Sequence, residues 1–495
     1  MLTIRKESPP SWRAISDSQT SEIFTDRGII TALKGIIQAG FLVCIGVALV
    51  ACGSDDGTSS AVAVSQGVVT AKGSVFVNGI EYNTTGATIR IDDNPGIESD
   101  LKVGMVVRVR GTSDDSTRKG TATQVDARDI LEGTISVVNA GAGTITVMGQ
   151  TVRIEDNVTR LNDDDAQKVF GQASFQLNDH VEVHGFADDQ GGLHATRVLR
   201  KATGEFESKG FVTGLGVSSF GLSLTPGGTA VLTVNFASGL LPAGTVNGSF
   251  VEVKSAAAPV TGAVTATLIH LEDRLGAAGE KVEVEGIVSS GTLASFVVNG
   301  QQVVTSASTV FEGGVSGDFA VGVKLEAEGP LDTNGAIAAT KISFRSNIKI
   351  EADASGVTAA GLTVLGKTVA INPFTRIDNG PVANTDHVEV RAIPDRDGNL
   401  IATRVVVQSA SSKAFLQGPV TAADGTAGTL TILGTTVVSN GSTEWRVSST
   451  STEVPVTKAA FFSQINATVT VVKVKWDPFT SVSAPIKEAE IEIGK

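Results

Sequence analysis

The chain has 495 residues and a formal net charge of −13, with 55 glycines, 14 prolines and three methionines. An acidic chain repels phosphate backbones, which argues against nucleic acid as a partner. Abundant glycine, and the lack of a long amphipathic helical pattern after residue 52, favour many short strands in a chain longer than one domain. Both cysteines, Cys44 and Cys52, precede the body, which therefore contains neither a disulfide nor a thiolate metal site.

The first segment of the chain predicts export. A basic flank precedes an uncharged apolar run over 35–48, which is shorter than the roughly 20 residues that span a bilayer. Small residues and Cys52 follow, an arrangement that resembles a bacterial lipobox, and this resemblance implies cleavage before Cys52 and diacylation of it. By the same resemblance, Gly53 indicates the outer membrane. Residues 1–26 either lengthen the leader or precede a true translation start near Arg27.

The rest of the chain repeats one unit. An alternating strand that ends on a small residue recurs every 63 to 74 residues, and a second alternating strand follows each copy after a turn. The first strand lies at 107–111, 181–185, 251–255, 325–329 and 388–392, with a weaker copy at 469–473, and the second at 120–125, 193–198, 264–269, 337–342 and 400–405. An earlier hairpin turns at Asn78-Gly79, Met148-Gly149, Asn299-Gly300, Leu365-Gly366 and Leu433-Gly434.

Five or six strands in about 70 residues are typical of small closed barrels such as the oligonucleotide/oligosaccharide-binding type. The sequence therefore predicts an all-β chain, a tandem array of about six small OB-like β-barrels behind a lipoprotein signal peptide. Because each unit has its own hairpins and alternating core, we expect a single unit to fold in isolation. The predicted division is a leader and signal peptide at 1–51, a flexible tether at 52–64, and β repeats at 65–130, 131–203, 204–275, 276–346, 347–412 and 413–495.

These motifs follow one another in a fixed order, which is clearest over 67–125 and 286–342. The order is Gly-x-Val/Ile, then Val-Asn-Gly, then an alternating strand ending in Gly, then Ala-Thr-x-Ile/Val. It is similar to the bacterial domain-of-unknown-function family 5666. The resemblance covers most of 65–412, while the divergent repeats at 204–275 and 413–495 lack the Asn-Gly turn. It implies an exported protein with several copies of one domain, often a lipoprotein, and it implies no established activity.

One segment satisfies the letters of a nucleotide-binding P-loop, from Gly361 to Gly366-Lys367-Thr368. A P-loop needs a strand that ends in a glycine-rich loop and a helix that follows it. Here the residues between the glycines form an apolar strand, and the chain continues as a strand after Lys367. We therefore interpret Gly366-Lys367 as part of a hairpin turn that does not bind nucleotide.

Three histidines are the only weak candidates for a metal site. His180 and His184 lie four residues apart on one strand, hence on one face, and His194 returns on the paired strand. Two interpretations stay open: a zinc-compatible trio, or the solvent side of an ordinary amphipathic strand. The second is favoured because Val181 and Val183 occupy the other face and no other unit repeats the trio.

Acidic residues recur in predicted turns at 92–93, 163–165, 188–189 and 395–397. The last of these resembles half of a calcium loop, but its twelfth position is Val406 instead of the glutamate that closes such a site. Weak calcium binding at these turns stays an alternative to a purely structural turn role.

These features predict an exported cell-envelope lipoprotein that acts as a non-enzymatic scaffold or multivalent binding protein through its repeats, since a linked array raises avidity. The expected partners are the membrane, through the lipid on Cys52, and a polymeric or protein component of the envelope, with no nucleic acid and no cofactor. Two alternatives stay open: a calcium- or small-ligand-binding envelope protein, and an enzyme with an unrecognised site. The sequence contains no Gly-x-Ser-x-Gly or His-Glu-x-x-His motif, so we predict no catalytic residue.

Overall fold

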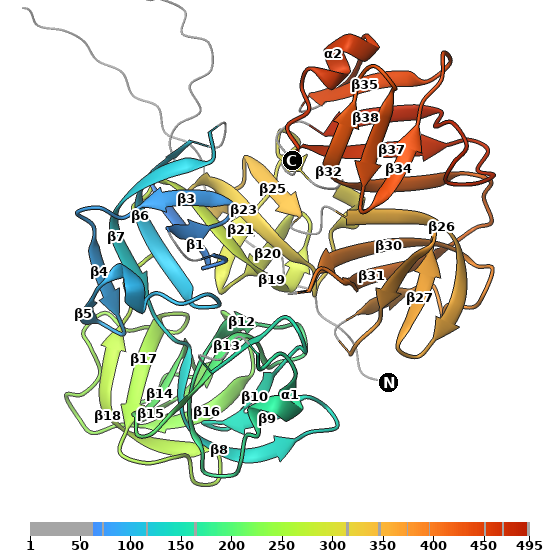
Figure 1. Cartoon of the computed structure of the whole chain (residues 1–495). Coiled ribbons are helices and arrows are strands. Elements are labelled where there is room, and N and C mark those ends of the chain that lie inside the picture. Colours follow the sequence, from blue (N-terminus) through green and yellow to red (C-terminus); the bar gives the residue numbers. More distant parts are fainter. Residues whose placement is uncertain are drawn as a thin grey trace, which may run out of the picture. The chain divides into compact units, whose positions relative to one another are not determined.

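The computed structural model describes residues 63–492 except 72–73, 115–116, 163–165, 313–315, 345–347, 374, 396, 450–451 and 468–469 (Figure 1). Cys52 and the predicted leader lie outside the described residues. Within them the chain is nearly all β and forms several barrel-like sheets, as the sequence predicts. The helical elements are short: α1 (Phe170–Ala173), α2 (Lys458–Phe462) and the 3-10 turns η1 (Glu98–Asp100) and η2 (Ser316–Asp318). None of the helices in the described part of the chain has the length and apolar character needed to cross a membrane.

The first sheet joins strands of the first and fourth repeats. Strand β1 (Val64–Val68) pairs antiparallel with β6 (Val106–Asp114) and parallel with β19 (Lys281–Thr292). In the second pairing Ser65 lies opposite Glu283, 218 residues further along the chain. The other strands of this sheet are β2 (Val75–Val77), β3 (Ile80–Asn83), β4 (Thr88–Ile91), β5 (Asn94–Gly96), β7 (Lys119–Ala127), β20 (Ser295–Val298), β21 (Gln301–Val304), β22 (Val310–Glu312), β23 (Lys324–Pro330), β24 (Ile337–Ala338) and β25 (Lys341–Phe344).

The second sheet is formed by the second and third repeats, which are consecutive. Strands β8 (Leu131–Asn139) and β14 (Phe206–Thr213) pair antiparallel, with Glu132 opposite Glu207. The sheet also contains β9 (Thr144–Val147), β10 (Gln150–Arg153), β11 (Arg160–Leu161), β12 (His180–Ala187), β13 (Leu193–Lys201), β15 (Ser219–Ser223), β16 (Ala230–Asn235), β17 (Phe250–Ser255) and β18 (Ala263–Leu271).

The third sheet is formed in the same way by the fifth and sixth repeats. Strands β26 (Ile348–Thr358) and β32 (Ala414–Asp424) pair antiparallel, with Lys349 opposite Gln417. Its remaining strands are β27 (Gly361–Val364), β28 (Lys367–Ala370), β29 (Arg376–Asp378), β30 (His387–Pro394), β31 (Leu400–Gln408), β33 (Thr429–Ile432), β34 (Thr435–Val438), β35 (Glu444–Ser449), β36 (Thr452–Pro455), β37 (Val471–Trp476) and β38 (Glu488–Glu492).

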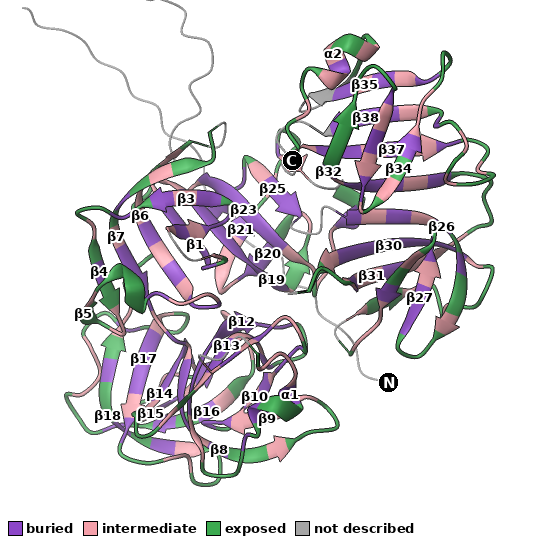
Figure 2. Ribbon diagram, in the orientation of Figure 1, coloured by how far each residue is buried: buried purple, intermediate pink, exposed green. Residues whose placement is uncertain are grey.

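The hydrophobic cores follow these pairs of repeats. One buried cluster joins residues of the second repeat, such as Val183, to residues of the third, such as Leu222. A second cluster joins Ile350 of the fifth repeat to Trp476 of the sixth. Figure 2 shows buried residues along the strands of each sheet and exposed residues mainly at the turns. The strands of the second repeat also close on themselves, from β8 through β9, β10, β13 and β12 back to β8. Those of the third repeat do so from β14 through β15, β16, β18 and β17 back to β14. These repeats are therefore closed units that are joined through their first strands and share a core, and the folding of a single unit in isolation stays a prediction.

The predicted hairpin turns are confirmed. The two central residues have positive φ at Asn78-Gly79 (53° and 78°) and at Leu365-Gly366 (50° and 72°), as type I′ turns require. The turns at Met148-Gly149, Asn299-Gly300 and Leu433-Gly434 have the same signs of φ. Leucine and methionine are unfavourable in this conformation, so favourable packing of their side chains has to offset the cost of the positive φ.

The side chain at the first turn position packs against a glycine on the first strand of the same repeat. A Cβ added to Gly286 would lie 2.8 Å from Cβ of Asn299, and one added to Gly133 would lie 3.0 Å from Sδ of Met148. The same contact joins Gly67 to Asn78 and Gly418 to Leu433. The recurring glycine and the later turn residue are thus one packing unit, which explains why they recur together in the sequence.

Candidate functional site

The glutamates of the recurring alternating strands are buried, whereas Arg108 and Arg110 of the first copy and Lys254 of the third are partly exposed. We use the word joint for the pairing of the first strands of two repeats: β1 with β19, β8 with β14, and β26 with β32. In β12, Val181 and Val183 face the core, while Glu182 and His184 lie on the opposite face and contact groups around the joint. Buried glutamates recur at Glu182, Glu252, Glu283, Glu326 and Glu389. Where these glutamates lie, the opposite face of the strand is therefore covered by protein instead of water.

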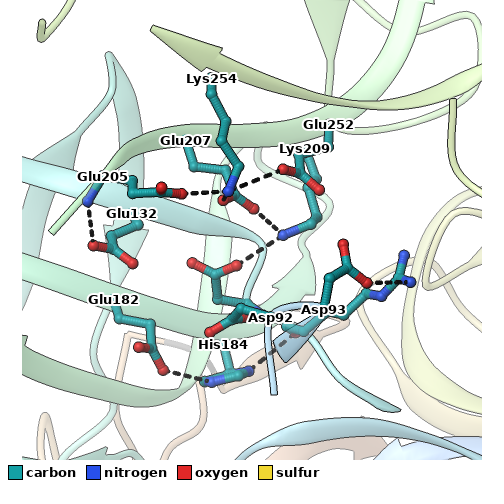
Figure 3. Close-up of polar contacts among 12 residues, drawn as sticks. Asp92, Asp93, Glu132, Glu182, His184, Glu205, Glu207, Lys209, Glu252 and Lys254 are labelled. Atoms are coloured by element: carbon teal, nitrogen blue, oxygen red, sulfur yellow. Dashed lines mark hydrogen bonds and ion pairs between the residues drawn. The ribbon is translucent and has the colours of Figure 1, made fainter. Parts of the chain in front are cut away.

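The largest buried charge cluster lies at the β8–β14 joint (Figure 3). Lys209 on β14 exposes 4% of its side chain. Its Nζ lies 2.8 Å from Oδ1 of Asp129, two residues before β8, and also contacts Glu207. On β17, Nζ of Lys254 lies 3.3 Å from Glu207 and 3.4 Å from Glu252. One buried ammonium thus connects Asp129, in the segment that leads into the second repeat, to Glu207 of the third repeat.

A second set of contacts connects β12 and β13 to the same joint. Nζ of Lys201 lies 2.9 Å from Oε2 of Glu132 and 3.1 Å from Oε2 of Glu182. Oε1 of Glu132 accepts a hydrogen bond of 2.6 Å from the backbone N–H of Glu205, in the third repeat. The joint therefore combines backbone pairing with charged hydrogen bonds, which are stronger than neutral ones.

Burial raises the pKa values of these carboxyls, whereas neighbouring positive charges lower them. Burial raises the pKa of Asp129 to about 6 against the attraction of Lys209. Burial and the charge of Asp129 raise the pKa of Glu207 to about 7. Burial also acts to raise the pKa of Glu182, but the hydrogen bond and charge of His184, together with Lys201, lower it to about 2.

The three candidate histidines do not converge on one point. Nε2 of His180 lies 3.1 Å from Glu132, Nε2 of His184 lies 3.0 Å from Glu182, and Nε2 of His194 lies 3.0 Å from Glu155. Each imidazole thus contacts a different carboxylate. The interpretation of these histidines as a solvent face is wrong for His184, whose side chain is fully buried. Among the described residues, no group of three or more His, Cys, Asp or Glu side chains is arranged to hold a metal ion.

The acidic turns at 188–189 and 395–397 bond to their own backbone, whereas at 92–93 Asp92 accepts a hydrogen bond from the N–H of Asp129 and Asp93 pairs with Arg128. Oδ1 of Asp395 accepts hydrogen bonds from the N–H groups of Asp397 and Asn399, both at 2.8 Å. Oδ1 of Asp188 accepts in the same way from Gln190 and Gly192, and its Oδ2 lies 2.6 Å from Arg153. These are the contacts of structural turns. The cluster at 163–165 lies outside the described residues.

The P-loop pattern is a hairpin, as the sequence analysis predicts. Val364 at the end of β27 pairs with Lys367 at the start of β28, and no helix follows. Lys367 is half-buried, less exposed than we expected for a turn lysine, and burial lowers its pKa.

We expect Lys367→Ala to change the free energy of unfolding by no more than about 0.5 kcal/mol, since nothing depends on its charge. Gly366→Val should cost about 1–2 kcal/mol, because Gly366 has φ = 72° and a β-branched residue is strained there. Thermal unfolding followed by the fluorescence of the buried Trp476 in the same sheet measures both. ATP binding that disappears in Lys367→Ala would contradict the interpretation.

The buried cluster was not predicted as a site. Glu182 and Glu252 belong to the recurring strand, whereas Asp129, Glu207 and Lys209 lie outside it. Asp129 and Glu207 are buried, both contact Lys209, and both have pKa values raised by burial. Such an arrangement can join two repeats and bind protons. It does not present a nucleophile or a free acid to a substrate.

Comparison with known proteins gives a family and no activity. A family model described as "Domain of unknown function (DUF5666)" matches residues 64–126, 132–198, 285–343, 350–406 and 417–481. The resemblance drawn from the sequence is thus confirmed, and it extends to part of the sixth repeat, which the missing Asn-Gly turn had set apart. No curated protein matches the chain.

Two solved structures show weak similarity. The CSD456 segment of Drosophila Unr is 13% identical, with 43% of this chain and 98% of that chain covered and a TM-score of 0.14. A multidomain protein with nucleic acid binding domains from Streptococcus pneumoniae is 13% identical, with 43% and 72% covered and a TM-score of 0.13. At these scores neither similarity supports a functional argument.

Proposed function

Because the chain belongs to the DUF5666 family, a domain of unknown function, we propose its role from its own architecture. The proposed role is that of an exported, lipid-anchored protein of the bacterial cell envelope, a non-enzymatic scaffold that presents its repeats in fixed pairs to a multivalent partner. The partner class is a polymeric or protein component of the envelope. The observation that carries the proposal is the joint, where charged residues are buried and bonded to one another between repeats.

Paired repeats favour a scaffold over a string of independent domains. The pairing of first strands in the second sheet has counterparts in the other two: Ser65 lies opposite Glu283, to which its hydroxyl donates a hydrogen bond of 2.8 Å, and Lys349 lies opposite Gln417. Similar surfaces at fixed spacing raise avidity for a repeating partner without one strong site. The lipobox-like leader supports the location, and the proposed anchor is Cys52.

The location is tested at Cys52. We expect cells that produce the protein to incorporate labelled palmitate into it, and Cys52→Ser to remove the label and release the protein from the membrane fraction. Val217→Asp, a substitution at a 99% exposed position of the body, is the matched control and should leave label and location unchanged. Label that persists in Cys52→Ser would refute the proposed anchor.

The multivalent role is tested by removing one pair of repeats. The third sheet has its own core, so a chain that ends before 348 should keep the other two sheets. Sedimentation with isolated cell envelopes should show at least about tenfold weaker binding for the shortened chain, as loss of avidity requires. Equal binding by both chains would contradict multivalence. Heat released on calcium titration, or turnover in a broad hydrolase screen, would favour the two alternatives instead.

A further inference from the structure

The β8–β14 joint contains more carboxylates than cations. Strands of both repeats and the segments beside them contribute charged groups to it (Figure 3), and the groups at its centre, such as Asp129, Glu207 and Lys209, are buried. The carboxylates are Asp92, Asp93, Asp129, Glu132, Glu182, Glu205, Glu207, Glu252 and Glu272, and the basic groups are Arg128, Lys201, Lys209, Lys254, His180 and His184. A buried excess of negative charge is costly unless protons or cations neutralise it.

Asp129 and Glu207 are the two carboxyls that share one ammonium. Oδ1 of Asp129 and Oε1 of Glu207 both contact Nζ of Lys209, and all three side chains expose 4% or less of their surface. Oδ2 of Asp129 is buried and has no hydrogen-bond partner. If Asp129 is ionised, this oxygen stays without a donor. One proton on the Asp129–Glu207 pair leaves a single negative charge beside Lys209, with the more exposed Lys254 at 3.3 Å from Glu207.

We propose that the Asp129–Lys209–Glu207 cluster is a proton-binding site, and that loss of its proton loosens the joint between the second and third repeats. The cluster lies at the only residues through which β8 pairs with β14 in the described chain: Glu132 with Glu207, and Leu131 with Ser208. The N–H of Lys209 also donates to the carbonyl of Ile130 at 3.0 Å. The proton-binding group and the contacts of the joint are thus the same residues. This inference concerns the joint alone and does not depend on the envelope role.

The direction of the effect follows from the pKa values. The pKa values of Asp129 and Glu207 in the folded chain, about 6 and about 7, exceed those of free carboxyls, near 4. The closed joint therefore binds protons more tightly than the open one, and this stabilisation is lost as the pH rises from about 4 to about 7. Glu182, whose folded pKa is about 2, contributes the opposite effect, which is lost as the pH falls below about 4. The joint is therefore tightest in mild acid.

Hydrogen exchange of the full chain tests the proposal. We expect the protection factor of the Lys209 amide, corrected for intrinsic exchange, to be about tenfold lower at pH 8 than at about pH 5.5. Glu207→Gln, which resembles the protonated side chain, should abolish this difference and keep the amide protected at pH 8. Glu389→Gln is the matched control in the third sheet: Lys349 and Arg391 help to lower the pKa of Glu389, so the Lys209 amide should keep its pH dependence there.

A second measurement keeps the proposal testable if Glu207→Gln does not fold. The infrared spectrum of the wild-type chain should contain a protonated carboxylic acid band that titrates between about pH 6 and pH 7, well above free carboxyls. Asp129→Asn should remove or shift it. Protection that is independent of pH, the same pH dependence in Glu207→Gln, or a wild-type spectrum without this band would each overturn the proposal.

Discussion

Lys209→Met is expected to destabilise the second sheet by about 3–5 kcal/mol at pH 8, because the substitution leaves Asp129 and Glu207 buried without their common cation. The loss should shrink in mild acid, where both carboxyls can take up protons instead. Hydrogen exchange of β14 across a urea series measures it. The tryptophans Trp445 and Trp476 lie in the third sheet and would not report this event.

Lys254→Met is the matched control for this substitution. Lys254 contacts Glu207 from the neighbouring strand but exposes 28% of its side chain, so water can replace its charge. Exposed pairs contribute about 1 kcal/mol or less, and we expect the control to lose no more than that. Equal losses for the two lysines would mean that burial of Lys209 does not determine its contribution.

Val183→Asp is expected to unfold the second and third repeats together. Val183 is fully buried, and an unpaired carboxylate in its place costs several kcal/mol. Because its core continues into Leu222 and Val234 of the third repeat, protection should be lost in β15 and β16 as well as in β12. The fluorescence of Trp476, in the separate core of the third sheet, should stay native.

Val217→Asp serves again as the control, since a charge at a 99% exposed turn should change stability by less than about 0.5 kcal/mol. Retention of native protection in β15 and β16 in the Val183→Asp variant would show that the two repeats unfold separately. The shared core would then contribute less to cooperativity than its continuity suggests.

Local features of the fold could be predicted from the sequence because their causes are local. Asn78-Gly79 specifies a type I′ turn within a few residues, and Leu365-Gly366 could be recognised by its position between two alternating strands. The burial of Val183 and Leu325 follows from strand alternation for the same reason.

The site could not be predicted because its cause is distant in the sequence. The segment around Glu182 alternates in the same way whether its polar face meets water or a second repeat, so the pattern itself contains no information on burial. What covers Glu182 depends on Lys201 and on the pairing of β8 with β14, and Glu207 lies 75 positions from Glu132 in the chain. The sequence shows that Glu182 lies on the polar face of a strand, but it does not show which residues cover that face.

The parallel pairing of β1 with β19 has a consequence for how the chain is made. Synthesis proceeds from the amino terminus, and β6 is available to β1 soon after β1 itself. The other edge of β1 has no partner until β19 emerges, after the whole second sheet has been synthesised. Closing so long a loop adds little entropic cost, because the cost grows only with the logarithm of length. During that interval the unpaired edge of β1 is a template for strands of other chains.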